Sequence, residues 1–378
     1  ASALVINGDG DNDTLNVSEF GGTADAAGVL TDTTITGLGN AGTITYGTTE
    51  SQTLGLSDAA GGDTLTVTST HAGTTVIDGN GGNDTINVQA TTGATTVNAG
   101  AGSDTINVGD ASNSLDQILG PLGIDGGAHP AVPTMSESVT AKGVTVTATV
   151  PMGDTLNLND QGHAAAAQYN LADGTFNRDT TVSVTMFSEI ETINLNTGTA
   201  SNDINIIDTP DTSQTTVTSQ DAADDIDVTT TGDNSILIVN AAGDIDMVDL
   251  ATTGAASVTI VNAGSGDDIL TQVTSGAGSG VALNGEADSD TITIQNSGAT
   301  SVTLATGGTE NDMIEIRNAG ADSRVQADGD AGEDTISLRA LPATAQAQLN
   351  GGADKDVISL GSTDDATSVL SNILGTVM

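Results

Sequence analysis

Four stretches near the C-terminus decide the fold: ADSDTITI at residues 287–294, TENDMIEI at 309–316, AGEDTISL at 331–338 and ADKDVISL at 353–360. Each begins 22 residues after the one before it. In each, an aspartate precedes a segment in which aliphatic and polar residues alternate, the pattern of a β-strand with one buried face. A fixed period of this length indicates a repeat protein.

The aspartate in these stretches is a marker that recurs with the same period toward the N-terminus. The marker column consists of Asn202, Asp224, Asp246, Asp268, Asp290, Asp312, Asp334 and Asp356. The residues two and four positions after each marker are aliphatic everywhere except at Gln272, so both positions are expected to face inward. A second apolar column lies seven residues before each marker, at Leu195, Val217, Val239, Val261, Leu283, Ala305, Ala327 and Leu349. Each rung of the repeat therefore holds two strands and two turns.

These columns predict an all-β chain. β-Branched residues fill the strand positions, whereas the abundant Gly, Thr, Asn and Asp disfavour helix. A rung of 22 residues has no core of its own and is expected to stack on its neighbours. We predict a right-handed parallel β-helix, or β-solenoid, with about 22 residues and two main strands per rung and little or no helix. Asn240, Asn262 and Asn284, which follow the second strand, are expected to hydrogen-bond from rung to rung.

The repeat is looser before residue 191. Earlier markers stand at Asp13, Asp63, Asp84 and Asp104. We expect solenoid rungs over residues 1–109, with one rung near 43–46 and a long loop over 19–34. The register fails over residues 110–190, a segment with four of the six prolines, so it is either a decorated stretch of solenoid or a small inserted β-domain. Residues 191–378 are expected to form the regular solenoid.

Charge is the most unusual feature of the composition. There are 50 Asp and Glu residues against 6 Lys and Arg, a net charge of -44, and no cysteine. Such a chain repels phosphate backbones and has no basic cluster, which argues against nucleic acid as a partner. Self-repulsion on this scale favours divalent cations as partners. No apolar run is long enough to span a bilayer, so we expect no transmembrane segment and a secreted, extracellular or cell-surface protein.

Three glycine-rich turns point to a known family. GNGGNDTIN at residues 79–87, GDAGEDTIS at 329–337 and GGADKDVIS at 351–359 resemble the nonapeptide of hemolysin-type (RTX) calcium-binding repeats. The resemblance implies calcium in the turns. This chain departs from the family because only one turn per rung is acidic and glycine-rich, so calcium is expected along one edge only.

Electrostatics independently favours calcium. Stacked rungs lie about 4.8 Å apart, and like charges at that spacing repel by about 3 to 4 kcal/mol at an effective dielectric constant near 20. Calcium, which takes six to eight oxygen ligands, would relieve this repulsion. The alternative is that the marker aspartates cap backbone amides of the turn or lie in solvent. The predicted metal ligands are Asp9, Asp11, Asp13, Asp78, Asp84, Asp104, Asp244, Asp246, Asp268, Asp288, Asp290, Glu310, Asp312, Asp330, Asp334, Asp354 and Asp356.

The sequence favours a non-enzymatic structural role. No motif of a nucleophile or a zinc site is present, and we predict no catalytic residue. The expected function is that of a surface layer, a matrix or filament subunit, or an adhesin stalk stiffened by calcium. The alternatives are a β-helix enzyme acting on polysaccharide and an ice- or surface-binding solenoid. Because the first and last rungs are half complete, we expect end-to-end self-association through residues 4–17 and 369–378, unless the chain is one segment of a longer repeat protein.

Overall fold

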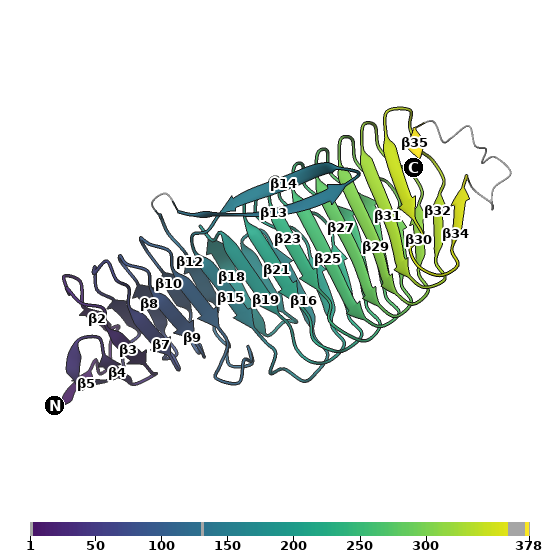
Figure 1. Cartoon of the computed structure of the whole chain (residues 1–378). Coiled ribbons are helices and arrows are strands. Elements are labelled where there is room, and N and C mark those ends of the chain that lie inside the picture. Colours follow the sequence, from purple (N-terminus) through teal and green to yellow (C-terminus); the bar gives the residue numbers. More distant parts are fainter. Residues whose placement is uncertain (1–2, 130–131, 362–374, 378) are drawn as a thin grey trace. The chain divides into compact units, whose positions relative to one another are not determined.

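The computed structural model describes residues 3–129, 132–361 and 375–377, and this part of the chain consists of strands and turns without a helix. Nearly all paired strands are parallel, and they stack rung upon rung (Figure 1). The chain is a parallel β-solenoid, which confirms the predicted fold class. It divides into two compact units, and each is described by itself.

The N-terminal unit comprises Ala1–Pro133, Pro151–Ala164 and Gly174–Gly198. Its strands are β1 (Ala3–Asn7), β2 (Thr14–Ser18), β3 (Ala27–Leu30), β4 (Thr34–Gly37), β5 (Asn40–Gly47), β6 (Ser51–Gly55), β7 (Thr64–Val67), β8 (Thr74–Asp78), β9 (Thr85–Val88), β10 (Thr95–Asn98), β11 (Thr105–Val108), β12 (Leu122–Asp125), β15 (Thr155–Asn159), β17 (Thr175–Arg178), β18 (Val182–Ser188) and β19 (Thr192–Asn196). Two parallel ladders hold its rungs together: β7–β9–β11–β15–β19 and β2–β6–β8–β10–β12–β18.

The first rungs of this unit contain one correction to the sequence prediction. The expected rung near residues 43–46 is present as β5, which pairs in parallel with β1. The expected loop over 19–34 is wrong in part, because Ala27–Leu30 forms β3, which pairs in parallel with β7 and antiparallel with β4. Leu30 is fully buried, and one buried leucine in a four-residue strand is too weak a periodic signal to stand out from the sequence.

The C-terminal unit comprises Thr134–Val150, Ala165–Asp173 and Thr199–Met378. Its strands are β13 (Thr134–Ala141), β14 (Val144–Pro151), β16 (Gln168–Ala172), β20 (Asp203–Ile206), β21 (Gln214–Thr218), β22 (Asp225–Val228), β23 (Ile236–Asn240), β24 (Met247–Thr252), β25 (Val258–Ser265), β26 (Ile269–Thr274), β27 (Gly280–Ala287), β28 (Thr291–Ile294), β29 (Val302–Thr309), β30 (Met313–Ile316), β31 (Arg324–Ala331), β32 (Thr335–Leu338), β33 (Gln346–Asn350), β34 (Val357–Leu360) and β35 (Thr376–Val377). Odd-numbered strands from β21 to β35 form one parallel ladder, and β16 with the even-numbered strands from β20 to β34 forms the other.

The core of this unit lies between its two ladders and is built from the predicted columns. Every residue of the second-strand column from Val217 to Ala327 is buried. The residues two and four positions after each marker, from Ile204 to Leu338, are buried as well. Gln272, the one polar member, is also buried, and its Nε2 donates to the carbonyl oxygen of Asn296 at 3.2 Å. The predicted asparagine stack is confirmed, since Asn262 donates to Asn240 and Asn284 to Asn262 at 2.9 and 2.8 Å.

A β-hairpin decorates the C-terminal unit. Strands β13 and β14 pair only with each other in the described residues and lie across β25, β27 and β29 (Figure 1). The hairpin buries Val139, Ala141, Ala148 and Val150 against outward-facing residues of the solenoid, namely Ile236, Val258, Ala282 and Val302. A Cβ on Gly280 would stand 3.0 Å from Cβ of Val139, so glycine provides the notch that admits the hairpin. The segment 110–190 thus contains solenoid strands with a hairpin inserted among them.

The last described strand departs from the 22-residue count. The count assigns Val369 and Asn372 to the second-strand row, and both lie outside the described residues. In that row β35 pairs with β33, so Val377 is the partner of Ala347. From Ala347 to Val377 the final rung spans 30 residues, whereas the preceding rungs from β21 onward span 22.

Candidate functional site

The marker aspartates of the C-terminal unit form a continuous ladder of hydrogen bonds. In each rung the backbone N–H of the marker donates to Oδ1 of the marker one rung further along the chain. These bonds run without interruption from Asn202 to Asp356, with N···O distances of 2.6 to 3.1 Å. The capping role considered for these aspartates is real, but each one caps the amide of the preceding rung rather than its own turn.

The N-terminal unit has a second ladder of the same kind. The N–H groups of Asp63, Asp84 and Asp104 donate to Oδ1 of the next marker at 2.6 to 2.7 Å, and the last acceptor in this series is Asp154. Asp154 in turn donates its N–H to Oε2 of Glu191 at 2.6 Å. A glutamate that no sequence pattern singled out therefore ends this ladder.

The marker strands belong to one ladder in each unit. In the N-terminal unit, β15, which follows the marker Asp154, pairs with β19. In the C-terminal unit, the strands that follow the markers are β20 and the even-numbered strands up to β34. Within each unit the acidic turns therefore follow one edge, and calcium along that edge stays a prediction.

The second carboxylate oxygen of most markers is buried and has no hydrogen-bond partner in the described structure. This holds for Oδ2 of Asp13, Asp84, Asp104, Asp154, Asp224, Asp246, Asp268, Asp290, Asp312 and Asp334. For Asp13, Asp84, Asp290, Asp312 and Asp334 the oxygen lies close to the glycine five positions earlier, where a Cβ would stand 2.1 to 2.7 Å from it. Each of these markers except Asp13 thus accepts an N–H at Oδ1 and has no partner at Oδ2.

Burial changes the acidity of these groups. It raises the pKa of Asp246 to about 8, and the negative charges of Asp268, Asp224 and Asp244 raise it further, against the lowering effect of the hydrogen bond from Asp224 N–H. Burial likewise raises the pKa of Asp290 to about 7 and of Asp312 to about 6. In the N-terminal unit it raises the pKa of Asp84 to about 7, with repulsion from Asp104 contributing. A ladder of weakly acidic carboxyl groups therefore runs through each unit.

The predicted metal ligands differ in burial. Asp84, Asp104, Asp246, Asp268, Asp290, Asp312 and Asp334 are buried ladder members, and Asp13, Asp78 and Asp356 are partly buried. Asp9, Asp11, Asp244, Asp288, Glu310, Asp330 and Asp354 are exposed on the turns. Several of the exposed residues adopt a left-handed backbone, for example Asp244 with φ of 68° and Asp288 with φ of 77°. Their carboxylates thus stand on the acidic turns, outside the buried ladder.

The described residues contain one group of three metal-ligating side chains within 4.8 Å of one another: Asp116, Asp160 and His163. None of the three was predicted. Arg178 already neutralises this group, since Nη1 donates to both oxygens of Asp160 at 2.7 and 2.8 Å and Nη2 donates to Asp116 at 2.6 Å. The guanidinium pairs and His163 lower the pKa of Asp116, although burial opposes them. The group is a partly buried ion-pair cluster that fastens β17 to the preceding turns.

The opposite turn of the C-terminal unit is held by hydroxyl groups. The N–H of Gly254 donates to Oγ1 of Thr231 at 2.9 Å, and Gly276 donates to Thr253 at 3.0 Å. Beside them, Ser257 Oγ donates to the carbonyl of Gly254 at 2.8 Å. These hydroxyl groups link rung to rung in the same way as the marker aspartates. In the first rungs of this turn, the carboxylates of Asp211 and Asp233 also accept the N–H groups of Asp233 and Ala255, both at 2.7 Å. The sequence contained the signal of the hydroxyl groups, a Ser or Thr every 22 residues at 209, 231, 253, 275 and 297.

No family model matches the chain, and a search of curated proteins finds no match. The evidence for function therefore comes from the aspartate ladders of the two units.

Proposed function

We propose that this chain is a non-enzymatic extracellular structural protein, a surface-layer, matrix or filament subunit or an adhesin stalk, in which the acidic turns bind calcium. The observation that carries the proposal is the uninterrupted ladder from Asn202 to Asp356. A carboxylate that bridges every pair of rungs resists their separation along the solenoid, which is the property that a spacer or a fibre requires. No helix in the described residues could cross a membrane.

The exposed turn carboxylates are the proposed calcium ligands. Asp288, Glu310 and Asp354 stand at the same place in their rungs, two residues before a marker, and all are exposed. Calcium accepts carboxylate, backbone carbonyl and water oxygens together, so a turn need not supply three carboxylates to hold it. The RTX-like glycine-rich turns at 329–337 and 351–359 support the same assignment.

The test compares two triple variants with equal charge changes. The turn variant is Asp288→Asn, Glu310→Gln and Asp354→Asn, and the control is Asp203→Asn, Asp225→Asn and Asp227→Asn, three exposed acids on outward strand faces. Calcium is expected to raise the melting temperature of the wild type and of the control above the values in chelator. The turn variant is expected to lose most of that increase. An unchanged melting temperature of the wild type after chelation would remove calcium as a structural cofactor.

End-to-end self-association through residues 4–17 and 369–378 is part of the same proposal; of the second segment, 369–374 and 378 lie outside the described residues. In support, Leu4 and Val5 of β1 are 53% and 64% exposed. Sedimentation velocity over a hundredfold range of concentration tests it. Growth of the sedimentation coefficient with concentration is expected, and a single monomeric species throughout would contradict polymerisation.

A further inference from the structure

Five aliphatic side chains lie exposed on the outer face of the C-terminal unit, on the ladder of the marker strands. They are Ile245, Met247, Ile269, Val273 and Met313, which are 37 to 57% exposed, and we call them the aliphatic patch. Met247 of β24 is the register partner of Ile269 of β26, and Met313 of β30 follows in the same outward column. Because neighbouring rungs supply them, they form one patch, and exposed apolar patches mark sites of interaction.

Aspartates adjoin the aliphatic patch on the side of the preceding rungs. Asp225 of β22 is the register partner of Met247, and Asp203 of β20 is the partner of Asp225. Asp227 and Asp249 are partners in the next outward column. We call these four aspartates the acidic patch. Burial raises the pKa of Asp225 and of Asp227, and repulsion from the other members of the acidic patch raises both further.

The rungs that form the acidic patch supply no positive charge to balance it. The sequence contains no lysine and no arginine between residues 179 and 316. A basic group from another molecule that contacts the acidic patch would therefore relieve repulsion among these aspartates without displacing a basic side chain of the same rungs.

The other ladder of the same unit shows how this chain covers an outward aliphatic row. There, Ile238, Ile260 and Leu304 pack against the hairpin of β13 and β14, which lies across β25, β27 and β29. The aliphatic patch belongs to the opposite ladder, and its side chains stay exposed in the described structure. The chain thus covers one of its two outward aliphatic surfaces and leaves the other open to a partner.

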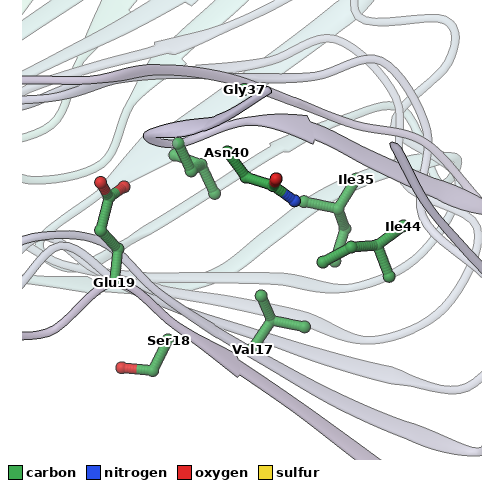
Figure 2. A pocket seen from close by; sticks show the side chains of 8 residues that line it. Val17, Ser18, Glu19, Ile35, Gly37, Asn40 and Ile44 are labelled. Atoms are coloured by element: carbon green, nitrogen blue, oxygen red, sulfur yellow. The ribbon is translucent and has the colours of Figure 1, made fainter. Parts of the chain in front are cut away.

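A small cavity of the N-terminal unit lacks this separation of acidic from aliphatic groups. It has a volume of about 200 Å³ and lies between the end of β2 and the β4–β5 hairpin (Figure 2). The amide of Asn40 lies beside Ile35, and Glu19 stands on the far side of the cavity (Figure 2). Pockets that hold drug-sized ligands have roughly 300 to 1,000 Å³. The outer face of the C-terminal unit is therefore the better-defined surface for recognition.

From an uncovered aliphatic patch that adjoins an acidic one, we infer that this face docks a cationic, amphipathic segment of a partner protein. Its lysine or arginine residues contact the acidic patch, and its aliphatic residues contact the aliphatic patch, where methionine adapts to varied shapes. Charge complementarity favours such a partner over a second copy of this chain, which has a net charge of -44. The strands from β20 to β30 span about 24 Å, the length of an extended segment of about seven or eight residues.

The test is a fluorescence titration of the full chain with the peptide Lys-Lys-Lys-Leu-Trp-Leu-Ser-Leu, blocked at both ends. Because the chain has no tryptophan, the signal comes from the peptide alone. Saturable binding with a blue shift of the emission is expected. Two control peptides, one with glutamine for each lysine and one with serine for each leucine, are expected to bind at least tenfold more weakly. Equal binding of either control peptide, or a signal that does not saturate, would overturn the proposal.

Two double variants with equal charge changes locate the basic end of the peptide. Asp225→Asn with Asp227→Asn is expected to weaken peptide binding at least tenfold. Asp9→Asn with Asp11→Asn, which changes two exposed aspartates of the N-terminal unit, is expected to leave the affinity within about twofold. Equal losses in the two variants would mean that only general attraction to a negative protein operates, and would contradict a site.

The variant Met247→Thr with Ile269→Thr checks the aliphatic patch. Threonine already stands in this outward column at Thr291 and Thr335, so the variant is expected to keep the circular dichroism spectrum of the wild type. Its affinity for the peptide is expected to fall at least tenfold, and unchanged binding would refute the inference. Concentration-dependent sedimentation that this variant abolishes would assign the face to a second copy of the chain, and would refute it as well.

Discussion

The two turns of each rung in the C-terminal unit solve one problem with different chemistry. At the acidic turn, a backbone N–H donates to a carboxylate of the neighbouring rung, as Asp246 does to Asp268 at 2.7 Å. At the opposite turn, the N–H of Gly276 donates to the hydroxyl of Thr253 at 3.0 Å. Both link adjacent rungs. Only the carboxylate brings a charge and a second oxygen, which remains buried and unpaired.

The comparison shows that a rung needs an acceptor at each turn but not a charge. Asp211 and Asp233 supply carboxylate acceptors in the first rungs of the hydroxyl turn. From Thr253 onward the turn is linked by neutral groups, and the stability of this part is expected to be indifferent to pH and to cations. The acidic turn gathers carboxylates whose pKa values rise through burial, so its stability depends on solution conditions.

The largest effect is that of pH. Because the folded-state pKa of Asp84, Asp246 and Asp290 lies at about 7 to 8, well above the ordinary value of 3.8, folding favours their protonated forms. That contribution is complete below about pH 4 and is lost progressively as pH rises from about 4 to about 8. In chelator, we expect the free energy of unfolding to fall by at least about 4 kcal/mol between pH 5 and pH 9, at about 1.4 kcal/mol per pKa unit. Denaturant unfolding followed by circular dichroism measures it, and a flat profile would contradict the raised pKa values.

The next effect is that of removing one acidic cap. Asp268→Ala leaves the N–H of Asp246 buried without an acceptor, which costs about 1 to 3 kcal/mol. Asp268→Asn retains an acceptor oxygen and adds an N–H donor while removing the charge, so it is expected to cost less and to reduce the fall in stability with pH. Asn202 shows that an amide can take this place, since its Oδ1 accepts the N–H of Ala167 at 3.2 Å. If the Asn and Ala variants were equally destabilised at pH 8, the capping bond would not be the relevant interaction.

The hydroxyl turn is expected to give a smaller, pH-independent loss. Thr253→Val keeps the shape of the side chain and removes the acceptor for Gly276 N–H, at a cost of about 1 kcal/mol. The same loss is expected at pH 5 and at pH 9. A loss that varied with pH would show that the two turns are electrostatically coupled.

The smallest effect is that of an exposed turn carboxylate. Asp244 is one of the charges that raise the pKa of Asp246. Asp244→Asn in chelator at pH 8 is expected to stabilise the fold by no more than about 0.5 kcal/mol, because exposed charges interact weakly. Urea unfolding of the two proteins side by side measures it, and a loss of stability would mean that Asp244 makes a favourable contact instead.

The solenoid was predictable because its signal repeats. Ile226, Val248 and Ile314 stand at the same position in their rungs, and all are buried. Each repeat of an aliphatic residue at this position therefore strengthens the prediction that it faces inward. The ladder was predictable only as an alternative. A period shows that the markers stack, but not that the carboxylate of one rung receives the amide of another, since that depends on backbone direction at the turn.

Features that occur once were predicted only in outline: the segment 110–190 was expected to carry a decoration, but its place on the solenoid was not predicted. The hairpin leaves a trace in the outward-facing Ile238, Ile260 and Leu304, which pack against it, whereas the same column has Thr216 before them and Gln326 after them. That trace has meaning only when the inward and outward faces are already known.

The hairpin also determines which rungs are interchangeable. Rungs that contact only their neighbours can be copied or lost without altering the rest. The hairpin, however, has a fixed length and meets one notch at Gly280 between Val258 and Val302. An extra rung inserted there would place beneath Val139 either a valine-sized side chain or a row of side chains that does not match the hairpin. A rung inserted after residue 316 would leave the hairpin's apolar contacts intact. Changes in the length of this solenoid are therefore expected to be tolerated toward its C-terminal rungs and rejected beneath the hairpin, a difference that soluble expression of the two insertion variants would reveal.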